Sequence, residues 1–197
     1  MFWTSEIEYR PGGNYFFVDG PLNISRSKQG RPVIFQAGTS SDFKNIASKH
    51  ADGVFLPAGN LEDIKAFSQE LKRREGLEGR SFDDFLLTIS HNPIVGRTER
   101  EAEGKFQELQ ALMPIYRIPK PKFFGLAEKA ADEIQHWYEA GAMDLLLIRQ
   151  EYPLGFNDFI DLVVPILQEK GIFGKEYELN TLRGNLGLPY PENRYSI

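Results

Sequence analysis

Four short apolar segments lie along the chain, and each is followed by a longer stretch with apolar residues at helical intervals. Short apolar runs of this kind are typical of strands that are buried on both faces, as in parallel sheets. The alternation therefore limits the fold more than any other feature of the sequence. We predict strands at residues 32–38, 53–56, 85–90 and 143–148.

The intervening stretches carry recognisable helix signals. Asn60 is a good N-cap residue in front of apolar residues at helical spacing. Thr98 and Glu101 match a capping box. Pro165 predicts a kink or a break in the last helix, because proline has no N–H to donate. We predict helices at residues 42–51, 60–75, 98–113, 127–139 and 156–170.

Four strand and helix pairs in succession indicate an α/β fold made of parallel βα units with right-handed crossovers. Two architectures fit this pattern. One is an open, doubly wound sheet, and the other is part of a (β/α)8 barrel, which normally requires about 250 residues. Four units in a chain of 197 residues amount to half a barrel. In both architectures, ligands bind at the carboxyl ends of the strands.

The composition excludes several classes of protein. No apolar run approaches the roughly 18 residues of a membrane span, and the first residues do not resemble a secretory signal. The absence of cysteine excludes disulfides and thiolate metal sites, and we expect a cytoplasmic protein. A net charge of -5 argues against binding to nucleic acid. We interpret the basic run at residues 72–74 as a solvated helix end.

The segment VIFQAGTSS, at residues 33–41, passes from a predicted strand into a predicted helix. Its glycine would let a ligand approach the backbone, and hydroxyls beside a helix N-terminus can hold an anion such as phosphate. The alternative is that the hydroxyls only cap the helix and the glycine only turns the chain. The candidate phosphate-binding residues are Ala37, Gly38, Thr39, Ser40 and Ser41.

Other side chains with chemical potential give weaker signals. His91 follows the third predicted strand, where a general acid or base could lie, and the alternative is a loop or surface histidine. His50 and His136 fall within predicted helices and lack a second ligand at i+4, so we predict no metal site. The sequence leaves the catalytic residues unassigned.

Six segments, in this order and spacing, are similar to the carboxyl-terminal part of the nitrilotriacetate and dibenzothiophene-sulfone monooxygenase group. That group belongs to the bacterial luciferase-like flavin monooxygenases. No single segment carries the resemblance, but the set covers most of the chain. The segments are residues 14–41, 46–55, 93–109, 128–144, 159–173 and 177–188.

The resemblance implies a TIM barrel of which this chain forms the carboxyl-terminal half. It also implies a two-component reaction, in which a separate flavin reductase delivers reduced FMN and a small organic substrate is oxygenated with O2. Residues 36–41 would then contact the FMN phosphate. We expect neither a metal ion nor nucleic acid to take part in this reaction.

The chain departs from the family pattern in several places. Family members are more than twice as long, and their first four strands have no counterpart here. A long stretch of the family sequence is reduced here to the short segment 115–125. Phe43 replaces a glycine of the phosphate loop. Leu126-Ala127 replaces a Ser/Thr-Pro helix start, and Leu145-Leu146 replaces Gly-Phe. The alternative is therefore a non-catalytic flavin- or phosphate-binding protein, or a structural remnant that lacks half of the active site.

We expect one truncated luciferase-like domain over residues 1–197. It would comprise a hairpin and loop at residues 1–31, βα units at 32–173 and a tail at 174–197. Half a barrel has two unpaired sheet edges and an inner face that needs a cover. We therefore expect a homodimer or a complementing N-terminal half, with the tail covering an edge as the less favoured option.

Overall fold

A computed structural model describes most of the chain, which divides into two units. Unit 1 comprises Met1–Pro32 and Leu179–Ile197, and unit 2 is Val33–Glu178. The predicted hairpin arm at residues 13–19 falls largely outside the described residues. Among the described residues, no helix combines the length and the apolar character that a membrane span requires. The described residues are 14, 15, 17, 24–56, 59–77, 85–113 and 115–192.

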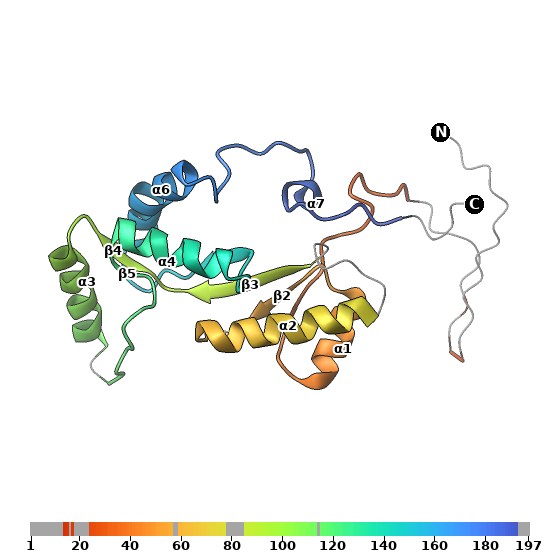
Figure 1. The fold of residues 1–197 in the computed structure, drawn as a ribbon, viewed down its shortest axis with the longest axis horizontal. Coiled ribbons are helices and arrows are strands. Elements are labelled where there is room, and N and C mark those ends of the chain that lie inside the picture. Colours follow the sequence, from red (N-terminus) through yellow and green to blue (C-terminus); the bar gives the residue numbers. More distant parts are fainter. Residues whose placement is uncertain are drawn as a thin grey trace. The chain divides into compact units, whose positions relative to one another are not determined.

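Unit 2 is built on a four-stranded parallel sheet (Figure 1). Its strands follow the chain order β1-β2-β3-β6, and each is parallel to its neighbour. All four predicted strands are therefore confirmed, and the sheet has the strand order that successive βα units produce. The strands are β1 (Phe35–Ala37), β2 (Gly53–Leu56), β3 (Leu86–His91) and β6 (Leu145–Ile148).

The helices begin where the capping signals predict. The Asn60 side chain accepts a hydrogen bond from the Asp63 N–H at 2.9 Å, and Thr98 Oγ1 accepts one from the Glu101 N–H at 3.1 Å. These bonds satisfy N–H groups that have no partner within the helix. The helices are α1 (Ser41–His50), α2 (Leu61–Leu77), α3 (Glu99–Leu112), α4 (Ala127–Glu139), α5 (Gly155–Asp158) and α6 (Val164–Glu169).

The predicted break at Pro165 takes the form of a π-helix, η2 (Phe159–Val163), between α5 and α6. Pro165 has no N–H, so the Asp161 carbonyl cannot receive the usual bond from the residue four positions on. The backbone changes to wider i→i+5 bonding in front of the proline. The turn keeps Phe159 and Val163 buried in the core.

A small second sheet was not predicted. β4 (Ile94–Gly96) pairs in parallel with β5 (Phe124–Leu126), and α3 connects them. Residues 115–125, which sequence analysis treated only as the short counterpart of a longer family insertion, include the start of β5. Each strand has three residues, too few to show a period in the sequence. Gly96 permits the close packing, since a Cβ there would lie 2.9 Å from the Ala102 backbone nitrogen.

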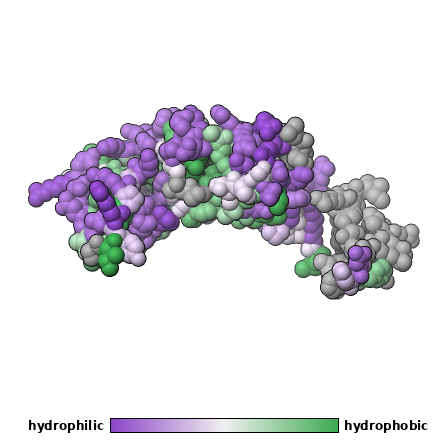
Figure 2. All heavy atoms as spheres, turned by 90° about the horizontal axis from the view of Figure 1, so that it is seen from below, coloured by the Kyte–Doolittle hydropathy of each residue, from purple (hydrophilic) through white to green (hydrophobic). Residues whose placement is uncertain are grey.

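Helices cover one face of the main sheet. Val54, Leu56, Leu87 and Ile89 alternate with the residues of the opposite face and pack in one core with α1, α2, α4, η2 and α6. In Figure 1, α2 and α4 lie alongside β3. Apolar side chains also reach the surface, in the middle of the side drawn in Figure 2. The described helices therefore do not enclose all of the apolar surface.

Two aspartates join neighbouring strands at the amino end of the sheet. Asp52 Oδ2 accepts a hydrogen bond from the Ile34 N–H, and Asp144 Oδ2 accepts one from the Leu87 N–H, both at 2.8 Å. Asp52 directly precedes β2 and bonds to the residue before β1, whereas Asp144 directly precedes β6 and bonds to β3. Burial raises the pKa of Asp144, while the bond from Leu87 opposes that rise.

Unit 1 brings the segment before β1 into contact with the C-terminal segment. Arg183, in α7 (Leu182–Asn185), is buried and donates hydrogen bonds at 3.3 Å to the carbonyls of Pro32 and Pro189. Gly30 fits closely here, because a Cβ at this residue would lie 2.7 Å from Pro191. The C-terminal segment thus contacts residues 26–32 within this unit.

Replacing Asp144 tests its bond to β3. Asp144→Ala should lower the free energy of unfolding by about 1–3 kcal/mol, because the buried Leu87 N–H loses its acceptor. Asp144→Asn keeps an acceptor oxygen and carries no charge, so it should cost much less at neutral pH, where the raised pKa makes the buried carboxylate unfavourable. Urea unfolding measures both variants, and equal losses would contradict this explanation.

Candidate functional site

The candidate phosphate loop leaves the carboxyl end of β1 and enters α1. Ala37, Thr39, Ser40 and Ser41 are exposed, and they lie at the end of the sheet where ligands bind in βα folds. The loop is short because α1 starts four residues after β1 ends. The predicted location of the loop, between a strand and a helix, is confirmed.

Ser40 caps α1, as the alternative interpretation of the loop proposed. Its Oγ accepts a hydrogen bond from the Phe43 N–H at 3.1 Å. The cap uses the hydroxyl as an acceptor, so its proton remains available for donation to an anion. The N–H groups of Ser41 and Asp42, in the first turn, are the other donors that face this end of the helix. Capping and anion binding are therefore compatible at this residue.

Phe43 closes the glycine side of the loop. Gly38 has a φ of +152°, and a Cβ at this position would lie only 2.7 Å from Phe43 Cδ2. The glycine therefore accommodates the chain's own phenyl ring, which lies where a ligand would approach the Gly38 backbone. In the sequence, Phe43 replaces a glycine of the family pattern. In the structure, its ring limits access to the Gly38 backbone.

Arg74 is a cation that contacts the loop from α2. Its Nη1 donates to the Ser41 carbonyl at 3.3 Å, and its Nη2 pairs with Glu70 at 2.7 Å. The guanidinium also bonds to Asn45, so it joins α2 to α1. Hydrogen bonds from Lys44 and Arg74 hold the pKa of Glu70 below its usual range.

The interpretation of residues 72–74 as a solvated helix end is wrong for Arg74, whose side chain is largely buried in this network. Its partners Ser41 and Asn45 lie about 30 residues earlier in the chain. No local pattern in the sequence could have paired them. At the loop, the positive charge of Arg74 is offset by Glu70 and by the exposed Asp42 in the first turn of α1.

His91 is buried in the core, and the prediction of a loop or surface residue is wrong. Strand β3 continues through His91, so strand alternation places its side chain beside Leu87 and Ile89, under the helices. Its ring lies 4.7 Å from that of Phe123 and 5.4 Å from that of Trp137. Burial lowers the pKa of His91 to about 4, with a smaller effect from nearby basic side chains.

The opposite face of the sheet carries polar groups that sequence analysis missed. The hydroxyls of Thr88 and Ser90 are buried and have no hydrogen-bond partner among the described residues. They alternate with the core residues of β3 and belong to the face that no described helix covers. The alternation of polar and apolar residues in FLLTIS was a usable signal. Buried hydroxyls normally have a hydrogen-bond partner, so these two are candidate contacts for a group that covers this face.

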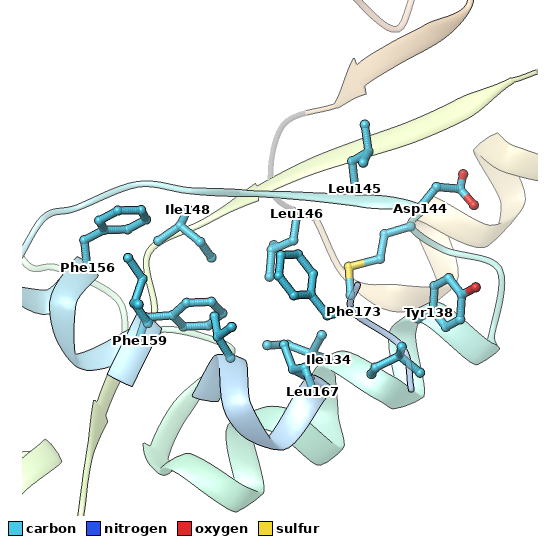
Figure 3. A pocket seen from close by; sticks show the side chains of 14 residues that line it. Ile134, Tyr138, Asp144, Leu145, Leu146, Ile148, Phe156, Phe159, Leu167 and Phe173 are labelled. Carbon is cyan, nitrogen blue, oxygen red and sulfur yellow. The ribbon is translucent and has the colours of Figure 1, made fainter. Parts of the chain in front are cut away.

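An apolar pocket lies on the helix side of β6 (Figure 3). Its volume is about 500 Å³, and β6, α4 and the helical segment from α5 to α6 supply its walls. The side chains of Ile148, Leu146, Phe159 and Leu167 point into it, whereas Leu145 points to the other side of the strand. Apart from the ends of Asp144 and Tyr138, the lining is apolar.

The buried His91 should make stability depend on pH. Its pKa falls from 6.5 to about 4 on folding, so its contribution is fully present above pH 6.5 and is lost as the pH falls towards 4. The loss should reach up to about 3 kcal/mol. His91→Leu should remove this part of the pH dependence in urea unfolding. Parallel losses in the variant and the parent protein would show that His91 is not the cause.

Comparison with known proteins agrees with this architecture. The family model described as luciferase-like monooxygenase matches residues 1–154. N-acetyl-S-(2-succino)cysteine monooxygenase of Bacillus subtilis (strain 168) is 33% identical over 247 residues, covering 93% of this chain and 56% of the relative. Nitrilotriacetate monooxygenase component A of Aminobacter aminovorans is 30% identical, with 92% and 54% covered.

Solved structures show the same relation. A long-chain alkane monooxygenase matches with a TM-score of 0.77 and 31% identity, covering 91% of this chain and 51% of that chain. The EDTA monooxygenase from Chelativorans sp. BNC1 matches with a TM-score of 0.75 and 25% identity, covering 93% and 57%. The chain thus spans about half the length of the relatives it matches.

The resemblance inferred from the sequence is confirmed, because both the nitrilotriacetate and the dibenzothiophene-sulfone monooxygenases are among the relatives. The predicted fold is also confirmed: the four parallel βα units correspond to half of a barrel in these monooxygenases. With most of its length matched by the family model, this chain belongs to the luciferase-like monooxygenase family.

Proposed function

We propose that the chain is the phosphate-binding half of a two-component, FMN-dependent monooxygenase that oxygenates a small organic substrate. Family membership supports the reaction class, and the exposed hydroxyl loop at the carboxyl end of β1 supports the cofactor. This loop is the observation on which the proposal depends, because an anion-binding group at a strand end is where βα folds bind phosphates.

The loop fits a phosphate on one side only. The hydroxyls of Thr39, Ser40 and Ser41 would donate to phosphate oxygens, together with the first N–H groups of α1. The ten-residue helix α1 adds a favourable dipole. The Gly38 side is closed by Phe43, so the phosphate would lie against the hydroxyls. When bound, reduced FMN supplies the electrons that activate O2.

The rest of unit 2 would position the cofactor and exclude water. The uncovered face of the sheet combines apolar Phe55 and Leu147 with the hydroxyls of Thr88 and Ser90. Once covered, this face would form a dry wall beside the loop, with two hydroxyls to orient a polar ring. No described side chain is assigned to proton transfer.

A second candidate is a protein that binds flavin or phosphate without catalysis, or a structural remnant. Phe43 favours it, since the ring blocks the approach to Gly38 and Asp42 adds a negative charge beside the loop. The chain also supplies only about half of the length of its monooxygenase relatives. Absence of FMN binding would leave only the structural remnant.

The partners follow from the proposed reaction. A separate flavin reductase would supply reduced FMN, in keeping with a relative that is named as component A. We place the protein in the cytoplasm, in keeping with the absence of cysteine. The relatives are named for substrates as different as nitrilotriacetate and a long-chain alkane, and we assign only the class of small organic compounds. A homodimer or an N-terminal half would complete the barrel.

Comparing FMN with riboflavin tests the phosphate site, because only FMN carries a phosphate. The chain should quench FMN fluorescence at micromolar concentrations and bind riboflavin more weakly. Phe43→Ala should tighten FMN binding about tenfold, equivalent to about 1.4 kcal/mol, by opening the Gly38 side. Its affinity for riboflavin should not change.

Thr39→Val serves as the matched variant in the loop. It keeps the shape of the side chain but removes a donor that does not cap α1, so FMN should bind more weakly while helix stability is retained. Ser40→Ala should weaken FMN binding and also cost about 1 kcal/mol of stability. Absence of FMN binding at high micromolar concentration in all forms would reject both flavin-binding proposals.

A further inference from the structure

The main sheet has two open edges and one open face. Within the described part of the chain, β1 bonds only to β2, and β6 bonds only to β3. Parallel sheets are otherwise found buried on both faces. Among the described residues, nothing pairs with these two edges or covers this face.

The exposed apolar side chains of the open face lie at its two edges. We define the open face by Phe35, Ala37, Phe55, Thr88, Ser90, Leu145 and Leu147, which alternate with the core residues. In the middle, Thr88 is 8% exposed and Ser90 is 4% exposed. At the edges, Phe35 on β1 is 40% exposed and Leu147 on β6 is 49% exposed.

We propose that a second copy of this chain covers the open face and closes an eight-stranded barrel. In this two-fold assembly, β6 of each copy pairs in parallel with β1 of the other copy. Closure leaves no unpaired edge, which is the usual solution to the exposure of strand edges. Two copies of four strands give the strand number of a (β/α)8 barrel.

The register of the sheet supports this occupant. Cα partners lie straight across the four strands, with Ala37 opposite Phe55, Phe55 opposite Thr88 and Thr88 opposite Leu145. An eight-stranded barrel of this type requires a total shift of about eight residues. The shift arises where β6 of one copy meets β1 of the other, and this contact occurs twice. Two-fold symmetry divides the shift equally between the two contacts, with about four residues at each.

This shift brings the two exposed apolar side chains together. Leu145 would lie opposite Val33 of the second copy, and Leu147 would therefore lie opposite Phe35 of the second copy. A shift in the other direction would place Leu145 opposite Ser41, the first residue of helix α1, where no strand exists. The only register that strands can form thus buries the exposed large apolar side chains of the open face.

The pocket beside β6 fits the same assembly. The helical segment from α5 to α6 follows the edge strand and would pack over the groove towards the next strand. In the second copy, Ile34 precedes β1 and Ile46 lies on α1, and they are 38% and 50% exposed. These two side chains are suited to fill an apolar pocket of about 500 Å³ in this position (Figure 3).

The assembly would also complete the anion site, a consequence that rests on the proposed function. In the same register, Arg149 lies opposite Ala37 of the second copy, directly before the phosphate loop. The Arg149 side chain is 52% exposed and contacts Glu151 at 3.2 Å. It would bring a positive charge to a loop whose nearby Arg74 is held by Glu70 and Asn45.

Cysteine cross-linking tests the pairing, because the chain has no cysteine of its own. A mixture of Phe35→Cys and Leu147→Cys chains should form a disulfide-linked dimer on mild oxidation, and neither variant alone should do so. Leu112→Cys, exposed on α3, is the matched control and should not cross-link to Phe35→Cys. Light scattering of the unmodified chain should give twice the mass of 22.5 kDa.

A monomer at 100 µM, or equal cross-linking of the Leu112→Cys control, would overturn the proposal. So would a dimer in which Phe35→Cys cross-links to itself. These measurements need no flavin, so their failure is separate from failure of FMN binding. If the dimer forms, Arg149→Gln should weaken FMN binding several-fold and leave the mass unchanged. An unchanged affinity would reject the shared anion site and retain the dimer.

Discussion

The hydrogen bonding of four parallel strands is the interaction on which the rest of the structure depends. It sets the strands side by side, so that helices follow each strand and cover the core residues of one face. The same pairing leaves β1 and β6 with open edges and exposes a second face that includes Phe35 and Leu147. A parallel sheet normally has both faces buried, so these open surfaces are where we propose that the second copy binds.

The candidate phosphate loop shows how internal packing competes with ligand binding. Ser40 caps α1 and keeps its hydroxyl proton for donation, whereas Gly38 leaves room for the phenyl ring of Phe43. The hydroxyl side of the loop is open and the glycine side is closed. In the site that we propose, Phe43 therefore leaves only the hydroxyl side of the loop for an anion.

Local signals predicted the elements well where the pattern was long or a cap was present. The strand at 53–56, the helix at 127–139 and the caps at Asn60 and Thr98 are found as predicted. Strands of three residues, such as β4 and β5, carry too few positions to show a period. The role of Arg74 depends on partners about 30 residues away, and the position of His91 depends on one extra strand residue.

By itself, the sequence determined the order of the four main strands and their helices, the parallel βα class and the position of the hydroxyl loop, because these follow from local patterns and capping. The family followed from the resemblance of six segments. Only the tertiary structure decided which face of the sheet lies open, that His91 is buried, and that Phe43 lies against Gly38. Those features arise from contacts between segments that are distant in the chain, and their geometry is fixed only when the strands pair and the helices pack.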